Sequence, residues 1–169
     1  MSGIDQVISD EGLSILIGNT HDEYEKERHN LLNMLDNDVV GFIIEPTRST
    51  LDNPNLDVYQ MIVDSGKPAV FINAHYPQLN FPYVETNDTD AEKTLVDYLL
   101  DHGHERVLGV FQVDDLQGVH RMNGFIKSYQ THPNVSTSGD IMMYRSSDDI
   151  HDVLDKINPR VQVEMNALP

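Results

Sequence analysis

The sequence contains no cysteine and no tryptophan, and it is poor in basic residues, with 11 lysines and arginines among 169 residues. Without cysteine there is no disulfide framework, no cysteine-ligated zinc site and no thiol nucleophile. The 28 acidic residues give the chain a formal net charge of −17. Because nucleic-acid phosphates are bound by clustered lysine and arginine, this charge argues against direct binding of DNA or RNA.

Long hydrophobic runs are also missing. The near-apolar segment Val39–Ile44 is among the longest, and it is far too short to cross a bilayer. The first residues have neither the basic nor the apolar region of a secretory signal peptide. Hydrophobic residues still make up 39% of the chain and lie in short blocks, as in a globular domain. We therefore expect a soluble cytoplasmic protein, one domain or part of one, that does not associate with membranes.

The apolar blocks alternate with amphipathic stretches in a strand–helix repeat of roughly 25–30 residues, which is typical of parallel βαβ units. The block Val39–Ile44 is continuously apolar and predicts a strand that is buried on both faces. Strands are expected at Leu13–Ile17, Val39–Ile44, Ala69–Asn73, Arg106–Phe111 and Ile141–Tyr144, with a short extended piece at Tyr83–Glu85. The sequence therefore predicts an α/β fold with a parallel sheet.

Helices are predicted between these strands from their apolar stripes and boundary residues. Thr20 and Glu23 have the spacing of a capping box, which predicts that a helix starts at Thr20. Gly103 and Pro159 are expected to end two other helices. One helix is expected to end at Glu11. Five more are expected from Thr20 to Asn37, from Leu56 to Ser65, from Asp88 to Asp101, from Gln117 to Gln130, and from Ser146 or Ser147 to Ile157.

In open parallel sheets, ligands bind beyond the carboxyl ends of the strands. The loops at that position are rich in Asn, Asp, Glu, Thr and Tyr and poor in Gly, so a phosphate-binding cradle is not expected. Planar amide, carboxylate and guanidinium groups suit a polyhydroxylated ligand, because they pair with adjacent hydroxyls. These loops, residues 18–20, 45–48, 73–76 and 112–115, therefore favour a small polar ligand.

Three stretches resemble the effector domain of the LacI/GalR family of transcriptional repressors, and together they are most similar to the arabinose-responsive repressors of Gram-positive bacteria. They are Gly41–Ser49, Phe71–Tyr76 and Asp114–Phe125. The last contains the Arg-x-x-Gly-aromatic pattern that the general family shares, at Arg121–Phe125. The resemblance covers nearly the whole chain up to about Arg145.

The resemblance implies a type I periplasmic-binding-protein-like sugar-binding fold with two α/β subdomains. Residues 1–131 would form the first, and residues 132–169 the start of the second. A sugar, L-arabinose, would bind in the cleft between them and release a homodimeric repressor from its operator DNA. The resemblance places the DNA-binding module N-terminal to this chain and absent from it, in agreement with the negative charge. It implies no cofactor.

The sequence departs from the family pattern at its start. Family effector domains open with a central parallel strand before the first helix, whereas here only Met1, Ser2 and Gly3 precede that helix. We therefore expect a fold truncated at both ends, without its first strand and much of its second subdomain. Because a missing central strand leaves backbone groups of its neighbours unpaired, we expect that this chain alone is not a stable, ligand-competent monomer.

Three ligand-binding residues are predicted, each with an alternative. Arg121 holds the position at which family members contact the sugar, and a guanidinium pairs bidentately with neighbouring hydroxyls; the alternative is a salt bridge on a helix surface. Asn73 holds the position of a short polar residue that touches the sugar, or else it is a turn residue that bonds its own backbone. Glu45 follows an apolar strand and contacts the ligand, or else it is a solvated strand end.

Tyr76, Asp115 and Gln117 complete the predicted ligand-binding set. Tyr76 would stack on a sugar ring or pack between subdomains. Asp114 and Asp115 fit three alternatives: the paired carboxylates of an acid–base site, a sugar contact, or negative charges favoured at the N-terminus of the following helix. Gln117 lies in the first turn of that helix and faces the same region.

Other functions fit the sequence less well. His102 and His104 form the closest histidine pair, but no carboxylate has helical spacing to both, so no metal site is predicted. No Gly-x-Ser-x-Gly motif is present, and no enzyme is expected. The alternative to a repressor is a sugar-binding protein of a transport system, which has the same fold.

Overall fold

The computed structural model describes residues 2–104, 106–132 and 139–166. These residues divide into two compact units. The first unit comprises Met1–Phe42 and Pro54–Pro68, and the second comprises Ile43–Asn53 and Ala69–Pro169. Within the described residues, no helix is both long enough and apolar enough to span a bilayer. The predicted subdomain boundary between residues 131 and 132 stays a prediction.

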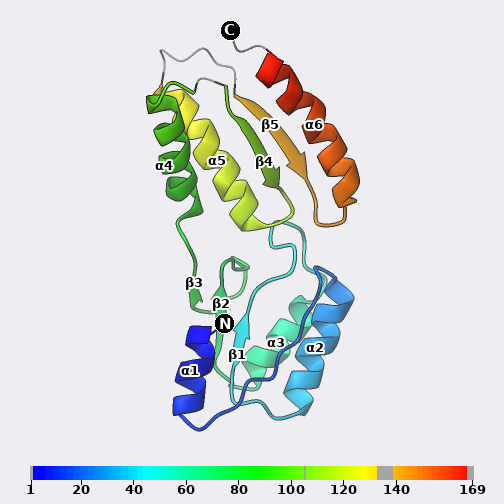
Figure 1. Cartoon of the computed structure of the whole chain (residues 1–169). Coiled ribbons are helices and arrows are strands. Elements are labelled where there is room, and N and C mark those ends of the chain that lie inside the picture. The colour runs from blue at the N-terminus through cyan, green and yellow to red at the C-terminus, as the bar shows by residue number, and fades with distance from the viewer. Residues whose placement is uncertain (1, 105, 133–138, 167–169) are drawn as a thin grey trace. The chain divides into compact units, whose positions relative to one another are not determined.

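In the first unit, a buried carboxylate joins two helices. It contains the helices α1 (Ser2–Asp10), α2 (Tyr24–Asp36) and α3 (Leu56–Asp64) (Figure 1). Glu27 of α2 is 2% exposed and accepts hydrogen bonds from Asn55 Nδ2 at 2.9 Å and from the hydroxyl of Tyr59 at 3.0 Å. Because a buried carboxylate is tolerated only when it is hydrogen-bonded, this cluster fixes which faces of α2 and α3 meet.

Two small sheets organise the rest of the chain. The first has three strands in the order β1 (Phe42–Ile44), β2 (Ala69–Ile72) and β3 (Tyr83–Val84). β2 and β3 are parallel, with Phe71 opposite Tyr83. The second sheet pairs β4 (Leu108–Gln112) with β5 (Asp140–Tyr144), again in parallel. β4 therefore shares a sheet with β5, the strand that the sequence assigned to the other subdomain.

Three helices accompany these strands: α4 (Asp88–Asp101), α5 (Leu116–Thr131) and α6 (Ile150–Asn166) (Figure 1). A core of buried side chains joins α4, α5 and β4, and its members are Val96, Leu100, Phe111 and Phe125. Phe111 and Phe125 meet edge to face with ring centroids 5.7 Å apart. The helices pack closely because Gly124 has no side chain: a Cβ there would lie 2.3 Å from the carbonyl oxygen of Thr89.

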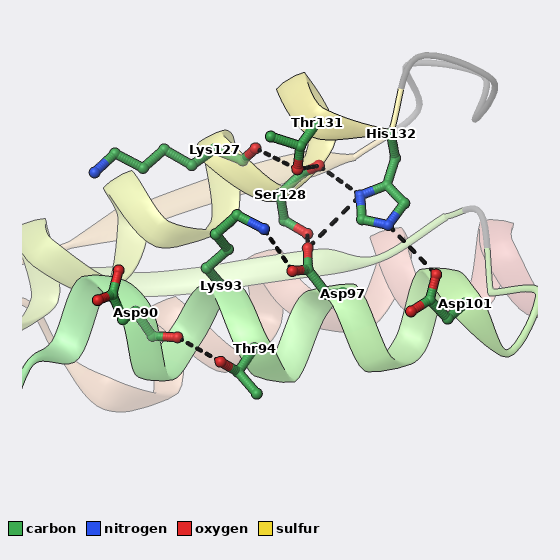
Figure 2. A network of polar contacts seen from close by, with 9 residues as sticks. All are labelled: Asp90, Lys93, Thr94, Asp97, Asp101, Lys127, Ser128, Thr131 and His132. Atoms are coloured by element: carbon green, nitrogen blue, oxygen red, sulfur yellow. Dashed lines mark hydrogen bonds and ion pairs between the residues drawn. The ribbon is translucent and has the colours of Figure 1, made fainter.

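A polar network also joins α4 to α5 (Figure 2). The carboxylate of Asp97 receives hydrogen bonds from Lys93 at 2.5 Å and from the buried hydroxyl of Ser128. His132 donates from Nδ1 to the carbonyl oxygen of Ser128 at 2.8 Å, and its Nε2 lies 3.5 Å from Asp101 Oδ1. The network therefore links α4 to the end of α5 through side chains that range from the buried Ser128 to the exposed Asp101.

The predicted strand at Leu13–Ile17 is wrong. This segment has no regular secondary structure, and Leu13, Leu16 and Ile17 are 47%, 52% and 67% exposed. An apolar run becomes a strand only when a neighbouring strand pairs with its backbone, and among the described residues none does so here. The capping-box prediction is also wrong, since α2 begins at Tyr24 and its N-cap Glu23 makes no side-chain capping bond.

Two further predictions need correction. The strand at Val39–Ile44 is reduced to Phe42–Ile44 and is not buried on both faces, because Ile43 is 46% exposed. β1 lies at the edge of its sheet, where it pairs with β2 alone among the described residues, and the face that carries Ile43 is open to solvent. Pro159 does not end a helix: α6 continues through it to Asn166. Pro159 is exposed, and a single missing amide costs one helical hydrogen bond without breaking the helix.

Candidate ligand-binding site

Two of the predicted residues meet at the carboxyl ends of β1 and β2. Glu45 follows β1 directly, and Asn73 follows β2. Nδ2 of Asn73 donates a hydrogen bond to Oε1 of Glu45 at 2.9 Å. Asn73 has φ +65, in the left-handed region that asparagine tolerates better than most residues. Both side chains are exposed, so the pair presents a carboxylate and an amide side by side to solvent, and their contact with a ligand stays a prediction.

The same strand ends carry a histidine and a carboxylate that sequence reasoning missed. Nδ1 of His75 lies 3.1 Å from Oε2 of Glu85, and the His75 ring stacks on Tyr83 with centroids 4.0 Å apart. Glu85 directly follows β3, as Glu45 follows β1. The strand-end rule that selected Glu45 and Asn73 would therefore have found Glu85, had Tyr83–Glu85 been treated as a full strand.

Tyr76 supports the loops of this site from below the surface. Its side chain is 1% exposed, and its hydroxyl donates to the carbonyl oxygen of Thr47 at 2.6 Å. The ring meets Phe71 edge to face at 5.8 Å. In this structure Tyr76 therefore ties the loop after β2 to the loop after β1 and offers no open ring face. Stacking on a ligand stays a prediction.

Asp115 and Gln117 lie at the start of α5. Asp115 is the N-cap of α5, and its Oδ1 accepts a hydrogen bond from the amide of Gly118 at 2.6 Å. This arrangement satisfies an amide that the helix itself leaves unpaired. Gln117 is half-buried in the first turn. The capping reading of Asp115 therefore agrees with its geometry, while the ligand contacts of both residues stay predictions.

Asp114, the neighbouring carboxylate, is buried in a cluster of its own. It is 2% exposed and accepts hydrogen bonds from the amide of Ser146 at 3.0 Å and from its hydroxyl at 2.6 Å. Nε of Arg48 donates to the same hydroxyl at 3.2 Å and lies 3.9 Å from Asp114 Oδ2. Asp114 is thus engaged by protein donors and is not presented to a substrate as an acid or base.

The segment 48–50 is attached to the carboxyl end of β4 and the start of α5. Besides the Arg48 contacts, Thr50 donates from its hydroxyl to the carbonyl oxygen of Val113 at 3.0 Å. The amide of Leu116 donates to the Ser49 hydroxyl at 2.9 Å. Residues 48–50, which follow Glu45 in the chain, are therefore bonded to the end of β4 and the start of α5, where Asp115 and Gln117 lie. All of these residues belong to the second unit.

Arg121 forms a salt bridge, as its alternative reading expected, while its contact with a ligand stays a prediction. Its Nε donates to Oδ1 of Asp88 at 2.8 Å, and the Arg121 side chain is nevertheless 49% exposed while that of Asp88 is 6% exposed. Burial raises the pKa of the neighbouring Glu92, while the charge of Arg121 works against this rise. Arg121 is therefore salt-bridged along one edge and still open to solvent. No three His, Cys, Asp or Glu side chains among the described residues are grouped to hold a metal ion.

Two curated relatives match most of the chain in sequence. The arabinose metabolism transcriptional repressor of Geobacillus stearothermophilus is 36% identical over 130 residues, and that of Halalkalibacterium halodurans is 37% identical over 128 residues. The matches cover 77% and 76% of this chain, but only 36% and 34% of the relatives. The chain therefore spans well under half the length of the curated relatives that it matches.

Solved structures match the fold. A LacI transcriptional regulator from Lactobacillus brevis superposes with a TM-score of 0.77 at 16% identity, over 96% of this chain and 58% of that one. At this identity the likeness shows the fold alone. No family model matches the chain. The type I periplasmic-binding-protein-like α/β fold is therefore confirmed, and so is the resemblance to LacI/GalR regulators and to the arabinose-responsive repressors that the sequence motifs indicated.

Proposed function

We propose that this chain, a relative of the arabinose metabolism repressors with a LacI-type fold, is the sugar-sensing part of a transcriptional repressor. The observation that carries the proposal is the sequence match to two such repressors over more than three quarters of the chain. The geometry supports it, since exposed polar groups gather where this fold class binds ligands. The sensor acts on no bond of its ligand, so the chain is not an enzyme.

The ligand that we propose is L-arabinose. Oε1 of Glu45 and Nδ2 of Asn73 lie 2.9 Å apart, and both side chains are exposed, so they can pair with adjacent hydroxyls of one pentose ring. Arg121 adds a planar cation that pairs with two oxygens at once. The arabinose assignment comes from the names of the relatives, because a carboxylate, an amide and a guanidinium suit many sugars equally well.

The sensor works by differential binding. A sugar that prefers one of two conformations of the repressor shifts the population toward it, and the coupling lowers the affinity for operator DNA. DNA contact falls to a module outside this chain, because a net charge of −17 repels phosphate. We further propose that the repressor is a cytoplasmic homodimer, as this mode of control requires two DNA-binding modules whose spacing can change.

Titration calorimetry tests this function on the gene product that contains this chain. L-Arabinose, D-xylose and D-ribose are titrated into the wild type and into Arg121→Ala, with Lys127→Ala as a control that removes an exposed cation from the same helix. We expect L-arabinose to bind the wild type and Lys127→Ala alike, and Arg121→Ala to bind at least about tenfold more weakly, since a charge-assisted hydrogen bond contributes about 1.5–3 kcal/mol.

The outcomes separate the ligand from the function. Binding of another pentose in place of L-arabinose would remove the arabinose assignment and keep the sensor. If no sugar binds the wild type, the sensor proposal fails. Sugar binding that leaves the affinity for operator DNA unchanged would instead favour a carrier protein of a transport system.

A further inference from the structure

We propose that Asp88 is a positioning residue that orients the guanidinium of Arg121 toward the ligand. The inference rests on the proposed function, because it assigns a role to Arg121 in sugar binding. It concerns a residue that lies outside the strand-end loops and that does not need to touch the sugar. Three features of the structure support it: the burial of Asp88, the single nitrogen that it engages, and the fixed spacing of the two helices.

The position of Asp88 is fixed by features other than its contact with Arg121. It is the first residue of α4, where the partial positive charge of a helix N-terminus favours a carboxylate. The residue is 4% exposed, and its amide donates to the carbonyl oxygen of Thr86 at 2.8 Å. A buried carboxylate requires a hydrogen-bonding partner, and Arg121 supplies one from the neighbouring helix.

The contact engages only one edge of the guanidinium. Nε of Arg121 donates to Asp88 Oδ1, and among the described residues neither Nη atom has a hydrogen-bond partner. The side chain is 49% exposed. A guanidinium is planar and has one edge formed by Nε with one Nη and an outer edge formed by the two Nη groups, so a contact at Nε alone leaves the outer edge open. That outer edge is the one that pairs bidentately with two neighbouring oxygens.

The spacing of the helices makes this orientation reproducible. Gly124, one turn after Arg121, lets α5 approach α4 so closely that a Cβ would lie 2.3 Å from the carbonyl oxygen of Thr89. The hydroxyl of Thr89 donates to the carbonyl oxygen of His120 at 3.1 Å. Both contacts, one with Gly124 and one with His120, involve Thr89, the residue next to Asp88. They therefore fix the distance between the helices at the point where Asp88 meets Arg121. Pre-organisation of this kind raises affinity by reducing the ordering cost of binding.

The experiment measures L-arabinose binding by calorimetry in the gene product that contains this chain. Asp88→Ala removes the acceptor, whereas Asp88→Asn keeps a carbonyl oxygen that can accept from Nε. Asp90→Ala is the matched control, because it removes an exposed carboxylate from the same helical turn without touching Arg121. We expect binding about tenfold weaker for Asp88→Ala, a smaller loss for Asp88→Asn and unchanged binding for Asp90→Ala.

A double-mutant cycle distinguishes positioning from a structural role. If Asp88 acts through Arg121, adding Asp88→Ala to Arg121→Ala should weaken binding no further. A structural role predicts the same loss of affinity with and without Arg121. Thermal melting of each variant, with calorimetry well below the lowest melting temperature, keeps unfolded protein out of the comparison.

The outcomes also separate this inference from the proposed function. If the wild type binds the sugar and Asp88→Ala binds equally well, the positioning role is overturned and the sensor remains. An additive cycle overturns it in the same way. If no sugar binds the wild type, the proposed function fails, and the inference fails with it. If Arg121→Ala binds like the wild type, there is no contact for Asp88 to orient and the inference is again overturned.

Discussion

The buried carboxylate of Asp114 joins the ends of β4 and β5 by accepting hydrogen bonds from both the amide and the hydroxyl of Ser146, at 3.0 and 2.6 Å. The two residues are 32 positions apart in the sequence. Arg48 binds the same hydroxyl from the segment that follows β1. One carboxylate thus connects three segments that the sequence presents as separate loops.

Removing this carboxylate should destabilise the protein. Asp114→Ala leaves the amide and the hydroxyl of Ser146 without their buried acceptor and Arg48 without its ion-pair partner, so we expect the free energy of unfolding to fall by about 3 kcal/mol. Asp148→Ala is the control, because its exposed carboxylate accepts a hydrogen bond from the amide of Arg145 in the same turn. Urea unfolding measures both, and an equal loss in the two variants would contradict the role of Asp114.

The buried carboxylate of Glu27 should matter in the same way for the first unit. Glu27→Ala removes the acceptor of Asn55 and Tyr59 between α2 and α3, so we expect a loss of about 3 kcal/mol in unfolding free energy. Glu25→Ala, on the exposed side of α2, should change stability by less than about 0.5 kcal/mol. Denaturant melts followed by circular dichroism compare them; a larger effect at Glu25 would show that the assigned helix faces are wrong.

Gly124 should be intolerant of any side chain. Gly124→Ala places a Cβ against the carbonyl oxygen of Thr89, so α4 and α5 must separate, and we expect a loss of about 1–3 kcal/mol despite the better helix propensity of alanine. Gly3→Ala meets no atom within 4 Å in α1 and should instead be neutral or stabilise by up to about 1 kcal/mol. Thermal melting distinguishes the two, and a stabilising Gly124→Ala would rule out the close helix contact.

The network between α4 and α5 should make stability depend on pH through His132. The carbonyl oxygen of Ser128, and then Asp101 and Asp97, raise the pKa of His132. A raised pKa means that the protonated form stabilises the fold; this contribution is complete below the unfolded-state pKa of about 6.5 and is lost as the pH rises through the higher folded value. The stability gap between wild type and His132→Gln should therefore be larger at pH 5 than above the folded pKa.

Asp101→Asn provides the control for this pH dependence. It removes one carboxylate facing His132 but keeps the hydrogen bond to Ser128, which is the largest cause of the shift, so the pH-dependent gap should shrink without disappearing. NMR titration of the His132 ring reports the pKa directly. A His132 pKa at or below the ordinary histidine value would refute this explanation. Asp97 contributes to the pH dependence at low pH. Burial raises its pKa, but hydrogen bonds from Lys93 and Ser128 lower it, and the resulting pKa lies below the ordinary value. The stability that ionised Asp97 adds to the fold is therefore lost as the pH falls.

Local pattern was sufficient for α4 and α5, but not for the start of α2 or the end of α6. α4 and α5 were predicted to within one or two residues because their apolar stripes and boundary residues act within a single turn. The segment Leu13–Ile17 failed for the opposite reason, since a strand exists only if another strand, distant in the sequence, pairs with it. The same holds for the candidate site. The rule that ligands bind at strand ends predicted Glu45 and Asn73 as site residues, whereas it missed Glu85 because β3 has only two residues.

By itself, the sequence determined the α/β class, the net negative charge and the resemblance to arabinose repressors. These depend on composition, periodicity and motif, which are properties of neighbouring residues. Only the tertiary structure decided that Arg121 is held by Asp88, 33 positions away, and that Tyr76 is buried under the site. The reason is physical: side-chain burial and hydrogen-bond partners depend on contacts between residues far apart in the chain, and no local spacing specifies them.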